Sequence, residues 1–392
     1  MNRLKDVVYD VIGWLAGVGP RRPGMNKKLL IVRVDEIGDY MLWRAFLKEI
    51  VTAEKYKGYE FHFCGNKSWK SLFDTFDGEL VQQSFWIDKI RFKKEMGYRY
   101  HFLKDISRQQ YDVVINPAFS RDKRYDDSIV KATGASETIG MVANLESVRA
   151  YESGYDKDLY TQLFDPSKKP AFEFFRNQLF TEFVTVHISL LKNTKVDANR
   201  LSSLSIPLPG KYFVVFPGSR SKSRIWPTES FIRVSNHLFE NYGWTAVIAG
   251  TNADKEYTDA FASQYKHPFV DLTGKTSLTE MLSLLKDAQC LLSVDTGSIH
   301  LAAAVGCTVF GIFNGSQYGR FAPYPSEIAN NIYAIYPDDV EKELKDPELV
   351  KKKYEFVVSV PYDTVKPEKV ILAIHHHYSE TSLDHGPWTM DH

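Results

Sequence analysis

Residues 293–304 form the most chemically informative run of the chain, Ser-Val-Asp-Thr-Gly-Ser-Ile-His-Leu-Ala-Ala-Ala. An apolar stretch ends at Asp295-Thr296-Gly297 and small, helix-favouring residues follow, which predicts a buried strand that turns directly into a helix. N–H groups of a first helical turn, the helix dipole and a glycine that permits close approach together favour a phosphate. In such a site His300 would add a hydrogen-bond donor to the phosphate, and Asp295 would accept hydrogen bonds from sugar hydroxyls. The alternative is an Asp or Thr cap with a core histidine.

Glycines and short polar side chains follow three further predicted strands in the second half of the chain. These strand ends are Pro217-Gly218-Ser219 after 212–216, Gly250-Thr251-Asn252 after 245–249, and Asn314-Gly315 after 308–313. The carboxyl ends of parallel strands meet at one edge of a sheet, where ligands bind in open α/β folds. We therefore expect these segments to converge with Asp295 on one cleft.

A basic loop follows the first of these strand ends and carries Arg220, Lys222 and Arg224. Cationic groups stabilise the negative charge that develops when a phosphate-linked leaving group departs. Ser219 is placed to donate a hydrogen bond beside them. By itself, such a loop is more often a solvated basic surface.

Apolar runs and helical spacing alternate along the chain. In the first half, strands are predicted at 28–34, 59–64 and 112–116 and helices at 40–50, 67–76, 98–109 and 172–191. In the second half, strands at 212–216, 245–249, 289–294 and 308–313 alternate with helices at 230–242 and 278–286. This order predicts parallel sheets with helices on both faces. Residues 192–210, with Asn, Ser and Pro but little apolar periodicity, are the predicted linker.

The composition suits a two-domain enzyme. At 392 residues with 44% hydrophobic content, the chain is too long for one typical core. Lys+Arg and Asp+Glu both number 49, so the charge balance gives no general reason to expect a nucleic acid. The three cysteines are far apart, which fits a reducing compartment and offers no zinc-type spacing. No apolar run is long enough to span a bilayer, and no cleavable leader pattern is found.

The first two dozen residues predict an amphipathic helix that stops at Gly-Pro-Arg-Arg-Pro-Gly. Its apolar residues recur at helical spacing and are Leu4, Val7, Val8, Val11, Ile12, Leu15 and Val18. Four cations, Arg21, Arg22, Lys27 and Lys28, follow, and an apolar face beside a cationic cluster suits an anionic membrane surface. The alternative is a helix docked onto the protein's own surface, since Gly13 and Gly17 weaken a free-standing helix.

Four motifs make the chain resemble the heptosyltransferase family of glycosyltransferases, often called glycosyltransferase family 9. They are residues 31–39 (Ile-Val-Arg-Val-Asp-Glu-Ile-Gly-Asp), 216–219 (Phe-Pro-Gly-Ser), 224–231 (Arg-Ile-Trp-Pro-Thr-Glu-Ser-Phe) and 295–304. The resemblance extends from about Met25 to about His375. It implies the GT-B fold, in which two Rossmann-like α/β domains face each other across a cleft.

The expected organisation has five parts. They are an N-terminal amphipathic extension at 1–24, an acceptor-binding α/β domain at 25–191, the linker at 192–210, a nucleotide-sugar-binding α/β domain at 211–374, and a tail at 375–392. The last helix either stays with the second domain or returns to the first.

Asp39 falls in the first turn of the first predicted helix, after Gly38. A carboxylate there complements the helix dipole, an effect worth at most about 1 kcal/mol. The resemblance implies more, because the family's proposed catalytic Asp aligns with Asp39, which would take the proton of an acceptor hydroxyl. Asp35 and Glu36 depart from the small hydroxyl residues common in the family, and their charge disfavours an anionic acceptor group close by.

The resemblance also implies two sets of donor-binding residues. The donor and phosphate set is Ser219, Arg224, Asp295, Thr296, Gly297 and His300, and the nucleotide set is Gly250, Thr251 and Asn252, with Asp254 nearby. The run 274–277 (Gly-Lys-Thr-Ser) leads into a helix with Ser277 or Thr276 as its N-cap, and it lacks the rest of a Walker A loop. No metal ligands are predicted.

These features predict a metal-independent, inverting glycosyltransferase that moves a heptose or related sugar from an NDP-sugar to lipopolysaccharide core or a related glycan. The donor, for example ADP-heptose, is a substrate, and no cofactor is expected. The alternatives are an NDP-sugar epimerase or other GT-B enzyme, or a glycan-binding relative without catalysis. A nicotinamide dehydrogenase is disfavoured because no Gly-x-Gly-x-x-Gly follows either first strand. The expected location is cytoplasmic, with peripheral contact at the inner membrane.

Overall fold

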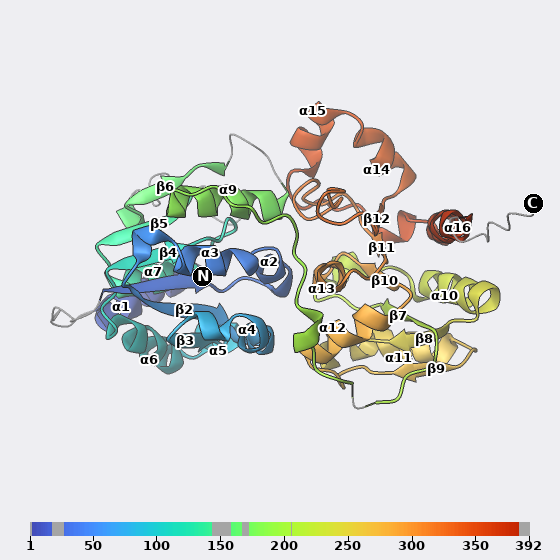
Figure 1. Cartoon of the computed structure of the whole chain (residues 1–392), viewed down its shortest axis with the longest axis horizontal. Coiled ribbons are helices and arrows are strands. Elements are labelled where there is room, and N and C mark those ends of the chain that lie inside the picture. Colours follow the sequence, from blue (N-terminus) through green and yellow to red (C-terminus); the bar gives the residue numbers. More distant parts are fainter. Residues whose placement is uncertain (1, 18–26, 143–157, 167–171, 205, 384–392) are drawn as a thin grey trace, which may run out of the picture. The chain divides into compact units, whose positions relative to one another are not determined.

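The computed structural model describes residues 2–17, 27–142, 158–166, 172–204 and 206–383 (Figure 1). The chain divides into two compact units, with the boundary between Thr194 and Lys195. This boundary falls inside the predicted linker, whose described part contains only a 3-10 turn, Ala198–Arg200.

The first unit is built on a six-stranded parallel sheet with strand order β3-β2-β1-β4-β5-β6. Its strands are β1 (Lys28–Arg33), β2 (Glu60–Asn66), β3 (Gln83–Ile87), β4 (Val113–Asn116), β5 (Glu137–Met141) and β6 (Gln162–Phe164). The central strands β1 and β4 are apolar runs that are buried on both faces, as expected for a parallel sheet.

Helices cover both faces of this sheet. They are α1 (Asn2–Gly17), α2 (Ile37–Met41), α3 (Ala45–Val51), α4 (Lys70–Phe76), α5 (Lys89–Lys94), α6 (Met96–Ser107), α7 (Asp126–Thr133) and α9 (Glu173–Thr185). Leu30 and Val32 of β1 share a core with residues of α5, α6 and α7, whereas α3 packs with α9. Leu30 and Val32 are two residues apart, so they lie on the same face of the sheet.

The second unit repeats this plan, with strand order β12-β11-β10-β7-β8-β9 in a parallel sheet. Its strands are β7 (Tyr212–Phe216), β8 (Thr245–Ile248), β9 (Phe269–Asp271), β10 (Leu291–Val294), β11 (Val309–Ile312) and β12 (Ile332–Ile335). Its helices are α10 (Thr228–Tyr242), α11 (Lys255–Gln264), α12 (Leu278–Asp287), α13 (Gly297–Val305), α14 (Asp338–Glu343), α15 (Pro347–Leu349) and α16 (Pro367–Leu383). The α/β class with two Rossmann-like units is therefore confirmed.

Helix α16 decides one open alternative and corrects the expected start of the tail. It packs on α10, β11 and β12, so of the two alternatives the last helix stays with the second unit. It also includes residues 375–383, so the expected tail at 375–392 is wrong over these residues. Tyr378 explains this extension, because its ring lies 4.9 Å from that of Trp244 and its hydroxyl donates to the carbonyl of Gln289.

Two predicted helices are shorter or broken. The helix predicted at 40–50 is divided into α2 and α3, which places Asp39 in a short separate helix. The helix predicted at 172–191 ends at Thr185, because Val186 adopts a left-handed backbone conformation with φ of 58°.

Helix α1 confirms that the N-terminal segment is helical, over Asn2–Gly17. It packs against α6 and α7, so the helix is docked onto the protein. Arg21 and Arg22 of the predicted cationic cluster lie outside the described residues. Within the described ranges, no helix combines the length and the apolar character that crossing a bilayer requires.

Candidate functional site

The first group of candidate site residues lies beyond the carboxyl end of β1, around Asp39, and is called the first half-site. β1 ends at Arg33 and α2 begins at Ile37, so Asp39 lies in the first turn of α2. The next residue, Tyr40, is buried, stacks on Trp69 with 4.2 Å between ring centroids, and donates its hydroxyl hydrogen to Asp77. These contacts fix the backbone at Asp39, while the Asp39 side chain itself is only half-buried.

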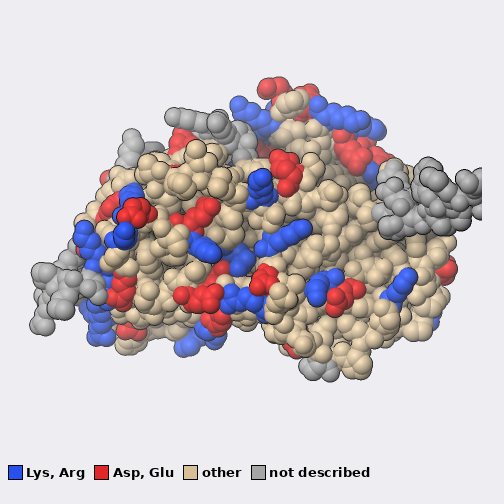
Figure 2. Space-filling model, in the orientation of Figure 1, with Lys and Arg blue, Asp and Glu red and all other residues tan. Residues whose placement is uncertain are grey.

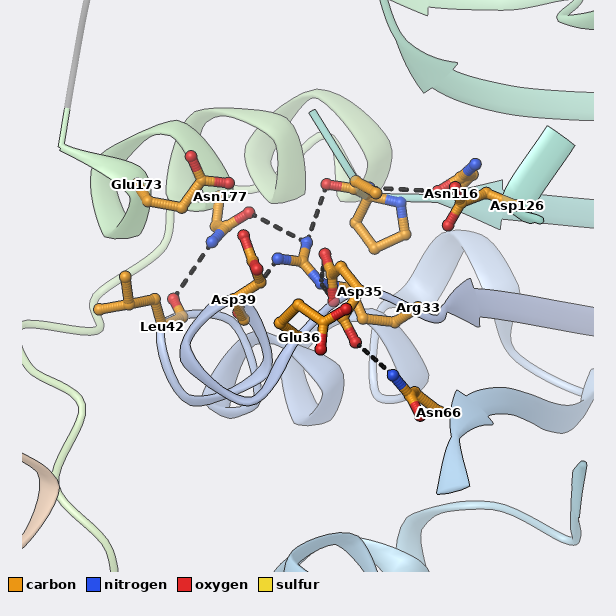
Figure 3. A network of polar contacts seen from close by, with 12 residues as sticks. Arg33, Asp35, Glu36, Asp39, Leu42, Asn66, Asn116, Asp126, Glu173 and Asn177 are labelled. Carbon is orange, nitrogen blue, oxygen red and sulfur yellow. Dashed lines mark hydrogen bonds and ion pairs between the residues drawn. The ribbon is translucent and has the colours of Figure 1, made fainter. Parts of the chain in front are cut away.

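Arg33 is fully buried and ties three segments to the turn that carries Asp39 (Figure 3). Its Nη2 donates to the carbonyl of Asp39 at 3.0 Å, and its Nη1 donates to the carbonyl of Pro117 at 3.0 Å and to Oδ1 of Asn177 at 3.4 Å. Its Nε lies 2.9 Å from the carboxylate of Asp35. A buried guanidinium with these acceptors is a positioning group. This role of Arg33 was not predicted, although an arginine inside an apolar strand is a usable signal.

Carboxylates gather around this turn. Asp35 is held by Arg33 through its side chain and by Asn66 and Trp69 through its carbonyl, each at 3.0 Å. Glu36 pairs with Lys89, whose Nζ lies 3.1 Å from Oε1. The structure therefore gives Asp35 and Glu36 cationic partners beside Asp39.

Burial controls the protonation of two members of this cluster. Burial raises the pKa of Asp35 well above its usual value; Arg33 opposes the shift, and the charges of Asp39 and Asp126 add to it. Burial also raises the pKa of Asp126 to about 7, although the N–H of Asp122 stabilises the carboxylate. The negative charge of this half-site therefore depends on pH around neutrality.

The second half-site lies beyond the carboxyl ends of β7, β10 and β11. These strands are neighbours in the sheet, so Ser219, Asp295 and Asn314 lie along one edge, as expected. Arg224, at the end of a 3-10 turn, places Nη1 3.1 Å from Oδ2 of Asp295 and donates to the Asp295 carbonyl at 3.3 Å. Burial raises the pKa of Asp295 and the charge of Arg224 lowers it. Two predicted site residues thus form an ion pair.

The N-terminus of α13 has the backbone geometry expected of an anion site. Thr296 is the N-cap residue with an extended backbone, and no side chain caps the helix. Its hydroxyl is instead 2.7 Å from that of Ser298 and 3.3 Å from that of Ser293. Thr296 and Gly297 are half-buried, so N–H groups of the first turn remain accessible to a ligand.

His300 is buried on α13, one turn into the helix. Its Nδ1 lies 2.6 Å from the hydroxyl of Tyr324, and its ring packs edge-on against Phe321. This placement agrees with the alternative of a core histidine as well as with a role beside a ligand.

The predicted nucleotide segment after β8 forms a tight turn with its own internal bonds. The N–H and hydroxyl of Thr251 both donate to Oδ2 of Asp254, at 2.8 and 2.7 Å, in a capping box. A Cβ at Gly218 would overlap the same carboxylate, which explains the glycine there. Thr251 and Asn252 remain exposed beside the half-buried Gly250.

Three other predicted polar residues have modest local roles. Ser219 is half-buried and its hydroxyl accepts the N–H of Ser221 at 3.3 Å, and Lys222 is exposed. Ser277 is confirmed as a helix N-cap, in a capping box with Glu280, which gives the Gly-Lys-Thr-Ser run a structural explanation.

Two tyrosines that the sequence analysis missed lie in the electrostatic field of Asp295. Tyr336 follows β12, so it lies at the same sheet edge, and Tyr362 lies in a 3-10 turn. Both are buried, and neither hydroxyl has a hydrogen-bond partner among the described residues. Burial raises the pKa of each phenol, and the charge of Asp295 adds to the shift.

Charges of both signs intermingle on the face shown in Figure 2, as the balanced composition implies. The described ranges contain no group of three or more His, Cys, Asp or Glu side chains arranged to hold a metal ion.

Two successive six-stranded parallel α/β units, the second with a helix that begins directly after the carboxyl end of a central strand, define a tandem Rossmann-like architecture. A family model described as glycosyltransferase family 9 (heptosyltransferase) matches residues 99–351. This match spans more than half of the chain, and the chain belongs to that family.

Curated relatives match shorter segments. The chain is 22% identical over 153 residues to lipopolysaccharide core heptosyltransferase OpsX of Haemophilus influenzae, covering 38% of this chain and 43% of that protein. It is 26% identical over 163 residues to lipopolysaccharide heptosyltransferase 3 of Escherichia coli, covering 41% of this chain and 46% of that protein. The chain thus spans less than half the length of either relative.

Solved structures are similar over most of the chain. A glycosyltransferase of family 9 from Veillonella parvula matches with a TM-score of 0.64 and 16% identity, covering 92% of this chain and 100% of that one. Escherichia coli heptosyltransferase WaaC with ADP matches with a TM-score of 0.62 and 17% identity, covering 89% and 99%. These likenesses confirm the expected GT-B fold class.

Proposed function

We propose that this protein is a glycosyltransferase that moves a heptose or related sugar from an NDP-sugar to lipopolysaccharide core or a related glycan. The family membership supports the class of reaction. The observation that carries the proposal is the Arg224–Asp295 pair, which lies directly before the uncapped N-terminus of α13. A cation, a carboxylate and the backbone N–H groups of a helix N-terminus at one sheet edge suit a sugar joined to a diphosphate.

The second unit would bind the donor. Asp295 would accept hydrogen bonds from sugar hydroxyls, and the N–H groups after Thr296 would bind a phosphate oxygen. Arg224 and His300 would stabilise the charge that develops on the β-phosphate, so the proposed chemistry assigns this task to the chain's own cations and dipoles. Tyr336, whose buried hydroxyl at this edge has no hydrogen-bond partner among the described residues, is a further candidate donor to the ligand.

The first unit would bind the acceptor, with Asp39 as the general base. The acceptor oxygen would attack the anomeric carbon as its proton passes to the Asp39 carboxylate. The bond between the anomeric carbon and the phosphate oxygen would break, and the nucleoside diphosphate would leave with the electron pair. One such displacement inverts the anomeric centre.

The charge of the first half-site bears on the choice of acceptor. Asp35, Glu36 and Asp39 lie together, with Arg33 and Lys89 as the cations that contact them. When all three carboxylates are ionised they outnumber these two cations, so a further anionic group close to the reacting hydroxyl would be repelled, and we infer that the acceptor is neutral at that position.

The donor and the proposed acceptor also suggest where the protein acts. A nucleotide sugar is a cytosolic solute and a glycolipid is held in a membrane, so we propose a cytoplasmic protein that works at the inner membrane surface.

Differential stabilisation by ligands tests the donor assignment. The protein would be heated with a panel of nucleoside diphosphates and NDP-sugars, and a binder at 100 times its Kd should add about 2.7 kcal/mol of stability. The same panel would be tested on the Arg224→Ala variant. Nucleoside diphosphates should stabilise this variant less than they stabilise the wild-type protein. If no diphosphate or NDP-sugar stabilised the wild-type protein, the proposed donor class would be wrong.

A transfer assay separates this proposal from the epimerase and non-catalytic alternatives. With a stabilising NDP-sugar and a lipopolysaccharide-core acceptor, the product should be a glycosylated acceptor and free nucleoside diphosphate. Conversion of the donor sugar without an acceptor would support an epimerase instead, and binding without any turnover would support a glycan-binding relative.

A further inference from the structure

Helix α1 is attached to the first unit by one of its faces. Tyr9 and Ala16 are buried, and the hydroxyl of Tyr9 donates to the carbonyl of Lys93 at 2.8 Å. The guanidinium of Arg99, from α6, lies 4.2 Å above the Tyr9 ring. These contacts set the rotation of α1 about its own axis, and so they determine which of its side chains face outward.

The outward face of α1 is apolar. Its exposed large side chains, with their exposed fractions, are Val7 (57%), Val8 (40%), Val11 (49%), Trp14 (66%) and Leu15 (46%). Positions 7, 11, 14 and 15 follow the i, i+4, i+7, i+8 spacing of a single helix face, and position 8 borders it. We call these five residues the α1 stripe. Scattered exposed apolar residues are ordinary, whereas a contiguous stripe on one helix marks an interaction surface.

Lysines lie on segments that contact α1. Lys93 and Lys94, at the end of α5, are exposed, and within the described ranges no ion pair joins either of them to an acidic side chain. Lys123 and Lys131 flank α1 on the α7 side, where their Nζ atoms lie 3.9 and 3.6 Å from the Asp10 carboxylate.

We propose that the α1 stripe and these lysines form a docking surface for a bilayer that contains anionic lipids. The stripe would enter the boundary between headgroups and acyl chains, with Trp14 at the interface where tryptophan is favoured. Lys93, Lys94 and Lys131 would contact the anionic headgroups. This surface is a property of α1 and its neighbours and does not depend on glycosyl transfer.

Charge distinguishes a bilayer from a second copy of the chain. In a symmetric dimer the same patch meets itself, so the lysines of both copies would gather at one interface and repel one another. An anionic bilayer instead complements the lysines and accepts the apolar stripe at the same time.

Vesicle binding by the full chain, without donor or acceptor, tests this proposal. Vesicles of phosphatidylcholine alone would be compared with vesicles containing about a third phosphatidylglycerol. We expect co-sedimentation with the anionic vesicles, and a marked decrease at about 1 M salt, where the Debye length is about 3 Å.

Matched variants assign the binding to this surface. Leu15→Asp should lower the vesicle partition coefficient about tenfold or more, whereas Leu372→Asp, at a leucine of α16 that is 68% exposed, makes the same change in the other unit and should have no effect. Lys93→Glu with Lys94→Glu should also lower binding about tenfold or more, on anionic vesicles only. All of the substituted residues are exposed, so the variants should keep the fold. Circular dichroism would check this.

Trp14 provides a direct readout. Its fluorescence should shift to the blue on anionic vesicles, and Trp14→Phe should abolish the shift while the variant still sediments with the vesicles. Equal binding by wild-type and Leu15→Asp proteins would overturn the proposal. The proposal would also be overturned if the wild-type protein bound no vesicles but self-associated, and if Leu15→Asp abolished that self-association. A second copy of the chain would then cover the stripe. Neither result would bear on ligand stabilisation by the donor, so the two proposals fail separately.

Discussion

Replacing Asp126 by asparagine should remove a pH dependence of stability that its buried carboxyl imposes on the first unit. Asp126 is 4% exposed, and burial raises its pKa from 3.8 to about 7. One of its oxygens accepts the N–H of Asp122 at 2.6 Å, and the side-chain oxygen of asparagine can take over that contact. Asp126→Asn therefore removes the titrating carboxyl group and keeps nearly the same side-chain shape.

The sign follows from the raised pKa. Between about pH 4 and pH 7 the folded chain keeps a proton on Asp126 that the unfolded chain has released, so the free energy of unfolding falls as pH rises. The slope from this one group is about 1.4 kcal/mol per pH unit, and three pKa units correspond to about 4 kcal/mol. Below about pH 4 both states are protonated and the contribution is fully present. Relaxation around the charge lowers the effect, so we expect the wild-type free energy of unfolding to lose about 2 to 4 kcal/mol between about pH 4 and pH values above 7.

Equilibrium urea unfolding at a series of pH values would measure this effect. Asp126→Asn should be more stable than wild type at pH 8 and similar to it at about pH 4, so that the difference grows with pH. Asp105→Asn is the control, because it removes the same charge from an exposed site on α6 and should change stability by less than about 0.5 kcal/mol. A constant difference between Asp126→Asn and wild type across this range would refute the reasoning.

Three further predictions concern the two half-sites. Asp39→Asn should lower the transfer rate by about 10² to 10⁴ while donor binding stays nearly unchanged, as ligand stabilisation would check, and near-normal turnover would make Asp39 a structural residue. Arg224→Ala and His300→Ala should each weaken binding of a nucleoside diphosphate more than binding of the bare nucleoside, and equal losses in calorimetry would remove the phosphate role. Tyr336→Phe should leave the melting temperature nearly unchanged and weaken donor binding by about 1 kcal/mol, whereas unchanged donor affinity would leave its hydroxyl without a role.

Local sequence patterns predicted the elements that carry the site. The strand β10 and the helix α13 follow from an apolar run that ends at Asp-Thr-Gly, because both the burial and the helix start depend on adjacent residues. The edge strands β3, β6, β9 and β12 were missed because they are short or partly exposed, so they lack the continuous apolar run of a central parallel strand.

Contacts between distant residues were beyond this kind of pattern. Tyr336 lies at the same sheet edge as Asp295 only because β12 pairs with β11, which pairs with β10. The sequence around these two residues does not indicate that pairing. Helix α16 did carry a usable signal, since Val370, Ile374 and Tyr378 recur at i, i+4 and i+8. The three histidines at 375–377 lie between Ile374 and Tyr378 and interrupt the apolar character of this segment.

The buried charges of the first half-site explain how a cluster of carboxylates can exist there. Four carboxylates, Asp35, Glu36, Asp39 and Asp126, share the electrostatic field of two cations, Arg33 and Lys89. The cluster lowers its own repulsion by retaining protons, because the pKa values of Asp35 and Asp126 are both raised. Asp39 is less buried than Asp126, and Arg33 binds its backbone carbonyl. A carboxylate whose main chain is fixed in this way, and whose residue is less buried than Asp126, is the better placed of the two to meet an acceptor.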